Sequence, residues 1–140
     1  LFLTATAGMR FEPPPLDIFT PKDEQGMLRL LQYLLHKPVK LPGWFLRDWL
    51  RTSRQRRQAV REMLDSMLTA QDLLDDQVCK IQIPTLILWG EHDRLIPPET
   101  GRHLASLMPQ ARLEVIEDCA HLLLHEALPT VTRHLDAWLD

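Results

Sequence analysis

Hydrophobic and polar positions divide the chain into two parts with different patterns. In the second part, short apolar runs alternate with amphipathic stretches, an order typical of parallel strands joined by helices. The apolar runs predict strands at 81–89 and 112–117, and the amphipathic stretches predict helices at 99–108 and 129–139. The first run is apolar almost throughout, as in a strand buried on both faces. We therefore expect an α/β unit in residues 80–140.

The preceding region, residues 9–79, has helical periodicity and almost no strand signal. Apolar residues spaced three and four apart predict a helix that starts at Thr20 and ends before Pro38. Two further helices are expected at 42–50 and 53–67. This region is therefore predicted to be a helical segment that precedes the α/β unit.

The opening segment, residues 1–8, is apolar and ends in Gly8, which predicts a strand running into a turn. It lacks the basic start and the length of about 15 residues that a secretory signal needs. No apolar run approaches the ~20 residues of a membrane-spanning helix. Because the chain begins with Leu1, we expect residues to precede it. Localisation stays open, with the cytoplasm favoured, since a signal or anchor would lie upstream.

Composition narrows the function only slightly. The chain is 45% hydrophobic and 25% charged, which is typical of a soluble globular protein. Its net charge of −3 gives no general reason to expect a nucleic-acid partner. Cys79 and Cys119 are too few for a disulfide framework and form no CxxC pair, so we expect free, buried thiols. No cofactor is expected.

A carboxylate and an imidazole follow the two predicted strands. Asp93 lies in the loop after the strand at 81–89, and His121 lies in the loop after the strand at 112–117. The carboxyl ends of parallel strands converge on one edge, so these loops can meet. An acid that orients a histidine makes two thirds of a nucleophile, histidine and acid triad. For an arbitrary pair, a turn cap and a loop histidine would be the favoured interpretation.

The usual nucleophile of such a triad is missing. None of the three serines, Ser53, Ser66 and Ser106, lies between glycines in a G-x-S-x-G turn. His121 and His125 are four residues apart and could share a helical face as metal ligands. No third ligand stands at a defined spacing, so no metal site is expected.

The residues around Asp93 and His121 resemble those of a known family. Residues 84–97, Pro-Thr-Leu-Ile-Leu-Trp-Gly-Glu-His-Asp-Arg-Leu-Ile-Pro, closely resemble the acid-bearing strand and loop of α/β-hydrolase fold enzymes. Residues 113–121 resemble their histidine-bearing strand and loop, and the order of acid before histidine also fits. The resemblance implies that Asp93 is the triad acid and His121 the triad base. By the same analogy, Cys119 is a packing residue.

Two positions depart from the family pattern. Ala120 stands where glycine is common, and Pro129 lies eight residues past His121 where seven is more usual. Neither difference removes a catalytic group, although both could alter the loop.

The resemblance also implies an architecture, the C-terminal part of an α/β-hydrolase fold, with parallel strands flanked by helices and an inserted α-helical cap. Residues 1–8 would be a core strand stub, 9–79 the cap or lid, and 80–140 the part of the core that carries the acid and histidine loops. The cap is most similar to those of monoacylglycerol-lipase-like and bacterial lipase members. The nucleophile and oxyanion-hole loop would lie upstream, so little activity is expected from this chain alone.

The implied function is that of a serine hydrolase, an esterase or lipase acting on apolar carboxylic esters. Five apolar residues are expected to line its acyl pocket: Trp44, Phe45, Leu46, Met63 and Leu95. Alternatively, the cap residues among them form a small core within the cap. An aspartate nucleophile upstream would instead indicate a dehalogenase or epoxide hydrolase. A non-enzymatic binding or regulatory module is the alternative from another class.

Two expectations concern partners. The arginines at 51, 54, 56, 57 and 61 most simply form a solvated helix face, and peripheral contact with an anionic membrane is the alternative. Removing the preceding half of the fold would expose unpaired strand edges and apolar faces. We therefore expect either a separate N-terminal half or a homodimer that shares a sheet.

Overall fold

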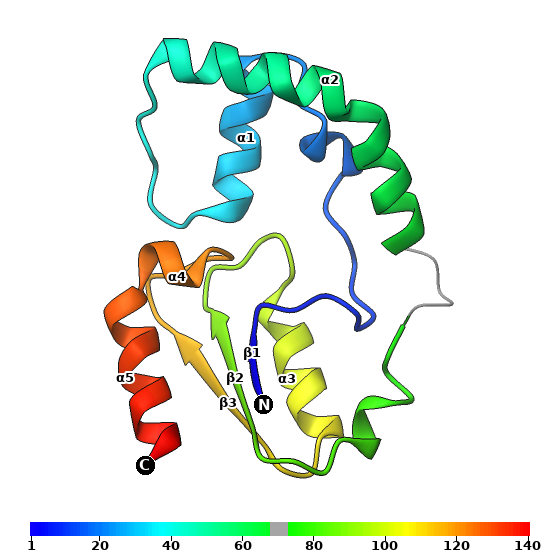
Figure 1. Cartoon of the computed structure of the whole chain (residues 1–140), viewed down its shortest axis with the longest axis vertical. Coiled ribbons are helices and arrows are strands. Elements are labelled where there is room, and N and C mark those ends of the chain that lie inside the picture. Colours follow the sequence, from blue (N-terminus) through cyan, green and yellow to red (C-terminus); the bar gives the residue numbers. More distant parts are fainter. Residues whose placement is uncertain (68–72) are drawn as a thin grey trace.

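A three-stranded parallel sheet with helices around it forms the lower part of the molecule in Figure 1. The computed structural model describes residues 1–67 and 73–140. In chain order its elements are β1 (Phe2–Thr4), the 3-10 helix η1 (Leu16–Phe19), α1 (Glu24–Leu34), α2 (Gly43–Met67), the 3-10 helix η3 (Val78–Lys80), β2 (Thr85–Gly90), α3 (Pro98–Leu107), β3 (Ala111–Ile116), α4 (Leu123–Glu126) and α5 (Leu128–Leu139). The sheet order is β1-β2-β3, which confirms the predicted α/β class.

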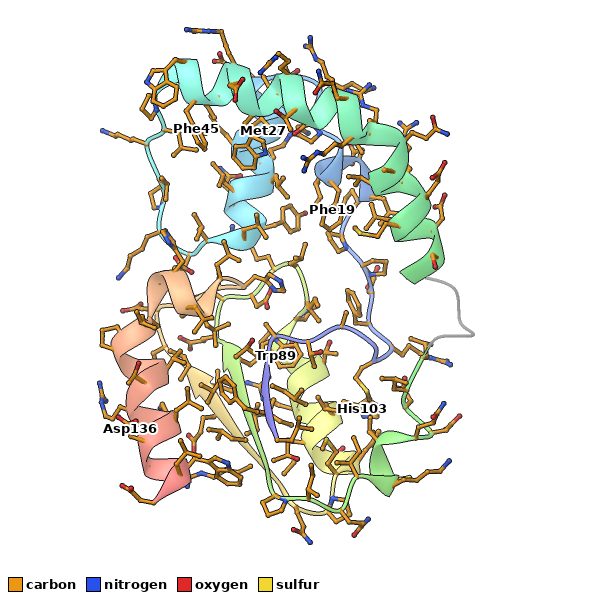
Figure 2. All side chains as sticks on the ribbon, viewed as in Figure 1. Phe19, Met27, Phe45, Trp89, His103 and Asp136 are labelled. Carbon is orange, nitrogen blue, oxygen red and sulfur yellow. The ribbon has the colours of Figure 1, made fainter. Side chains whose placement is uncertain are left out.

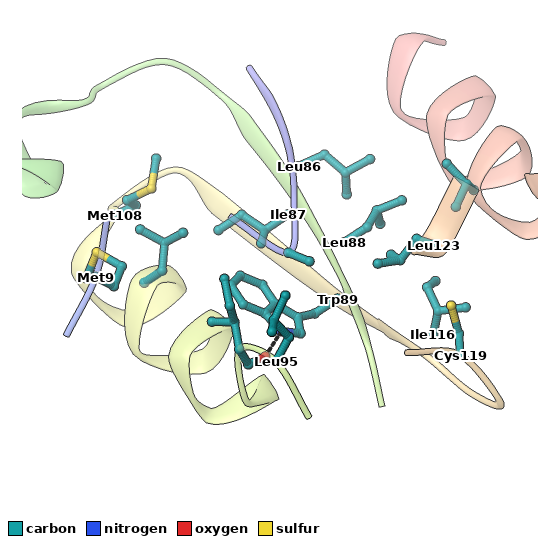
Figure 3. Packing of buried hydrophobic residues seen from close by; sticks show 14 of the residues in the cluster. Met9, Leu86, Ile87, Leu88, Trp89, Leu95, Met108, Ile116, Cys119 and Leu123 are labelled. Atoms are coloured by element: carbon teal, nitrogen blue, oxygen red, sulfur yellow. Dashed lines mark hydrogen bonds between the residues drawn. The ribbon is translucent and has the colours of Figure 1, made fainter. Parts of the chain in front are cut away.

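The central strand, β2, is buried along its whole length. Its side chains alternate between the two faces, so that Leu86 and Leu88 point toward α4 and α5 while Ile87 and Trp89 point toward α3 (Figure 3). The indole Nε1 of Trp89 donates a hydrogen bond to the carbonyl of Ile96 at 2.9 Å. Burial of both faces explains the nearly unbroken apolar run and confirms that prediction.

The strand begins at Thr85, four residues later than predicted. Pro84 precedes it and has no N–H to donate to a neighbouring strand. The apolar residues before this proline therefore belong to the connection from η3 and not to the sheet.

The helix α1 begins at Glu24, also later than predicted. Asp23 is its N-cap, and one carboxylate oxygen accepts a hydrogen bond from the amide of Gly26 at 2.7 Å. This bond satisfies an amide that has no partner inside the helix. The expected start at Thr20 was wrong because the cap is Asp23, whose backbone is extended, so the helix begins only after it.

A single helix, α2, stands where two helices were predicted. From Gly43 to the end of α2 no proline and no further glycine interrupts the sequence, and the pair Asp48 and Arg51, 2.7 Å apart, continues the helical i, i+3 spacing into the expected break at 51–52. The first half of α2 packs Leu46 and Leu50 against Met27 of α1 in a small core of its own.

Among the described residues, no helix has the length and apolar character needed to span a membrane.

The helical part is joined to the sheet part through the carboxylate of Glu126 in α4. One of its oxygens accepts hydrogen bonds from the amides of His36 at 2.8 Å and Lys37 at 3.1 Å, just after α1. The other accepts from the amide of Ala120 at 2.9 Å. Figure 1 shows α1 directly above this junction. One side chain therefore holds the end of α1 to the loop after β3.

We expect Glu126→Gln to lower the free energy of unfolding by about 1–3 kcal/mol. The glutamine keeps one acceptor oxygen, but its amide group would face the N–H of Ala120 donor to donor. Urea unfolding measures the loss. Glu62→Gln is the control, because Glu62 is exposed on α2 and its carboxylate accepts a hydrogen bond from Gln58, one helical turn away, and we expect a change within about 0.5 kcal/mol. Equal losses in both variants would contradict the anchoring role.

Candidate active site

The loops that follow β2 and β3 meet at one edge of the sheet. The parallel register pairs Gly90 with Ile116, so both strands end side by side. Beyond them the amide of His92 donates to the carbonyl of Cys119 at 2.9 Å. A Cβ on Gly90 would collide with the carbonyl oxygens of Cys119 and Ala120. Glycine at this position therefore allows the two loops to approach each other.

The buried carboxylate of Asp93 is held at both oxygens. Oδ1 accepts hydrogen bonds from the amides of Leu95 and Ile96, each at 2.9 Å. Oδ2 lies 2.9 Å from Nδ1 of His121, and the Asp93 side chain has no exposed surface. The backbone amides fix the carboxylate in the one orientation that presents Oδ2 to the histidine.

This contact sets the proton arrangement of His121. An ionised carboxylate can only accept hydrogen bonds, so Nδ1 carries the proton that lies toward Asp93. The other ring nitrogen, Nε2, is then the atom with which the histidine can accept a proton. The side chain of His121 is 20% exposed, so a reacting group can reach it. The two residues that the sequence singled out are therefore brought into direct contact.

An apolar cavity of about 270 Å³ lies beside His121. Its walls come from the segment after β1, from η1, from α2 and from the loop after β2. The lining residues are Ala5, Ala7, Gly8, Met9, Phe11, Pro13, Pro14, Leu16, Phe19, Met63, Leu64, Leu95, Ile96 and His121. One of them, Phe19 at the end of η1, is labelled in Figure 2.

Two of the five residues predicted to form a pocket line this cavity. Met63 and Leu95 line it, whereas Trp44, Phe45 and Leu46 do not. Because α2 is one continuous helix, Leu46 and Met63 are separated by about 25 Å along its axis. Trp44 is 67% exposed and packs edge to face with Phe45, while Leu46 belongs to the small core shared with α1. These three residues therefore do not line this cavity.

The two cysteines lie in different environments. Cys119 is buried between Asp118 and Ala120, and burial, with the negative charges of Glu126 and Asp93, raises the pKa of its thiol to about 11. Cys79 is exposed, so the expectation that both thiols are buried was wrong for it. Both are free thiols, as predicted.

Sequence reasoning missed two groups near the site. One is Glu126, which follows His121 by five residues without any pattern that indicates its three amide contacts. The other is a group of possible metal ligands formed by His36, His92 and Asp118. Their spacing in the sequence gives no signal, because three separate segments bring them together.

Comparison with known proteins identifies the family. A family model for the alpha/beta hydrolase fold matches residues 22–128. Lipase 1 of Psychrobacter immobilis is 27% identical over 124 residues, which cover 86% of this chain and 38% of the lipase. The 2-hydroxy-6-oxononadienedioate/2-hydroxy-6-oxononatrienedioate hydrolase 2 of Pseudomonas putida is 28% identical over 125 residues, covering 74% of this chain and 42% of that enzyme. The chain thus spans about two fifths of the length of these relatives.

Solved structures show the same fold. The chain superposes on a bacterial membrane phospholipase A with a TM-score of 0.79 at 20% identity, covering 99% of this chain and 48% of the phospholipase. It superposes on the 2-hydroxy-6-oxo-6-phenylhexa-2,4-dienoate hydrolase of Rhodococcus sp. strain RHA1 with a TM-score of 0.74 at 19% identity, covering 96% and 52%. Together with the family model, which spans most of its residues, this places the chain in the α/β-hydrolase fold family.

Proposed function

We propose that this chain supplies the acid and the base of a serine hydrolase that cleaves carboxylic esters with apolar acyl groups. The observation that carries the proposal is the contact between Nδ1 of His121 and the buried carboxylate of Asp93, beside an apolar cavity. The membership of the chain in the α/β-hydrolase fold family and its similarity to lipases support it.

The chemistry divides into two proton-transfer cycles around Nε2 of His121. First, Nε2 takes the proton of a serine hydroxyl as the serine oxygen bonds to the ester carbonyl carbon, and it then gives that proton to the departing alkoxide. In the second cycle, Nε2 takes a proton from water, whose oxygen attacks the acyl-enzyme, and returns the proton to the serine. Asp93 holds the ring in place and stabilises the imidazolium in both cycles. The products are an acid and an alcohol.

The lining of the cavity favours an apolar acyl group. Apart from His121, the described residues that line it carry no ionisable side chain. A carboxylate placed there would lose its water without gaining a charged partner, which is costly. The hydrolase of Pseudomonas putida is named for a dicarboxylate, so the cavity supports the lipase-like substrate class over that one.

The serine and the oxyanion donors are proposed to come from a segment upstream of this chain. Strand β1 pairs with β2 on one side only among the described residues, so its outer edge can accept a further strand from that segment. A homodimer joined through the same edge is the alternative arrangement. Peripheral membrane contact through the arginines of α2 stays a prediction.

Changing either member of the pair should abolish turnover in the protein that carries this chain together with its upstream segment. We expect Asp93→Asn and His121→Ala each to lower kcat for p-nitrophenyl butyrate and octanoate by about 10³–10⁴-fold, because the base is lost or held in the wrong tautomer. His125→Ala is the matched control, since His125 is exposed on α4 and lies only four residues from His121. It should keep the wild-type rate.

The identity of the nucleophile is tested by labelling with a fluorophosphonate, which reacts with activated serines. The proposal requires labelling of the wild type, at a serine upstream of this chain, that is lost in His121→Ala. Hydrolysis of haloalkanes or epoxides without labelling would overturn it in favour of an aspartate nucleophile. No turnover and no labelling would favour a binding or regulatory module.

Cys119 should not react as a nucleophile in the folded protein. With a pKa of about 11, only about a thousandth of its thiol is ionised at pH 8, and the thiolate is the reactive form. We expect iodoacetamide at pH 8 to modify exposed Cys79 and leave Cys119 unmodified, as measured by peptide mass spectrometry. Both should react in 8 M urea. Equal modification rates in the folded protein would contradict this expectation.

A further inference from the structure

Two histidines and an aspartate meet at the junction between the helical part and the sheet part. The rings of His36 and His92 stack with their centroids 4.1 Å apart. Nε2 of His36 lies 3.7 Å from Oδ1 of Asp118. One ligand atom from each of the three residues lies within 4.8 Å of the other two. The group is distinct from the Asp93 and His121 pair, although it shares both loops with that pair.

The backbone is held by hydrogen bonds at two of the three positions, and at the third it has an unusual conformation. The amide of His36 donates to Glu126 at 2.8 Å, and the amide of His92 donates to the carbonyl of Cys119 at 2.9 Å. Asp118 has a φ of 52°, a left-handed conformation that only a few residue types other than glycine, aspartate among them, adopt readily. The Cα positions of the two histidines are thus held before any ligand arrives, which lowers the entropic cost of binding one.

The side chains themselves have room to move. They are 28% exposed for His36, 40% for His92 and 76% for Asp118. In a tetrahedral zinc site, bonds of about 2.0–2.1 Å place neighbouring ligand atoms about 3.3 Å apart. The stacked rings therefore have to tilt toward each other, and the exposed carboxylate has to move in. Their exposure permits both movements and leaves a fourth position open to water.

The chemistry of the three donors fits a borderline metal. Two imidazoles and one carboxylate suit Zn²⁺, whereas Mg²⁺ and Ca²⁺ prefer oxygen ligands alone. The carboxylate of Glu91 lies 3.5 Å from Nε2 of His92 and adds negative charge that favours a cation. Lys37, next to His36 in the sequence, is the nearest positive charge along the chain and opposes the binding of a cation.

We propose that His36, His92 and Asp118 form a Zn²⁺ site that joins three segments of the molecule. His36 follows α1, His92 lies next to Asp93 in the acid loop, and Asp118 lies three residues before His121. A bound ion holds the helical part against both loops of the acid and base pair. Because it binds the folded arrangement only, zinc raises the melting temperature of the protein.

Zinc binding tests the proposal without any measurement of hydrolysis. Calorimetric titration of Zn²⁺ into the EDTA-stripped protein, with its upstream segment, should show one ion per chain with a micromolar Kd. Saturating zinc should raise Tm by several degrees. His36→Ala, His92→Ala and Asp118→Asn should each weaken binding by about tenfold or more. The cysteine variant His36→Cys, which again offers a zinc ligand, should restore binding.

The matched control is His103→Ala. His103 on α3 (Figure 2) also faces a carboxylate, with Nε2 3.2 Å from Oδ1 of Asp75, but these two belong to no three-residue group of ligands among the described residues. This variant should bind zinc as the wild type does. Melting curves without zinc show that each variant folds. Absence of zinc binding in the wild type would overturn the proposal, and so would binding that survives all three ligand changes but is lost in His121→Ala.

Discussion

The parallel pairing of β2 with β3 is the constraint on which the rest of the structure depends. Because of this pairing, both strands end at one edge of the sheet and the loops that follow them approach each other. Gly90 has no Cβ, which allows the loop after β3 to contact the loop after β2 directly. Asp93 and His121 meet only because both conditions hold. A residue with a Cβ in place of Gly90 would push the loop after β3 away from the loop after β2. A shift of the strand register would displace one loop relative to the other along the strand direction. The geometry of the pair is thus a property of the sheet.

The helical part depends on the same loop through a different residue. Glu126 binds the amide of Ala120, the residue just before His121, and at the same time the amides that follow α1. The cavity beside His121 is partly lined by α2, which packs on α1. The position of the cavity wall is therefore linked to the histidine loop by hydrogen bonds to one carboxylate. A change in the position of the cavity wall is therefore expected to shift the histidine loop, and a change in the loop is expected to shift the wall.

The sequence predicted the sheet part well and the helical part less well, for physical reasons. Strand β2 is buried on both faces, so its apolar run is unambiguous, and Asp93 and His121 stand directly after strands that must converge. In the helical part, periodicity located apolar faces but not what covers them. Leu46 and Met63 have the same character, yet one packs on α1 and the other lines the cavity. The approach of His36 to His92 and Asp118 arises from tertiary packing and has no local signal at all.

Burial, more than residue type, separates the environments of the side chains in the loops after β2 and β3. Asp118 is exposed and held in a left-handed turn, so its carboxylate faces solvent and can bind a cation. Asp93 is also an aspartate, but it is buried and bonded at both oxygens, so its Oδ2 faces His121 and not solvent. Between Asp118 and His121, burial keeps the Cys119 thiol protonated. Four consecutive residues thus present a carboxylate, a neutral thiol, an anchored amide and an imidazole, and the direction in which each one faces decides what it can do.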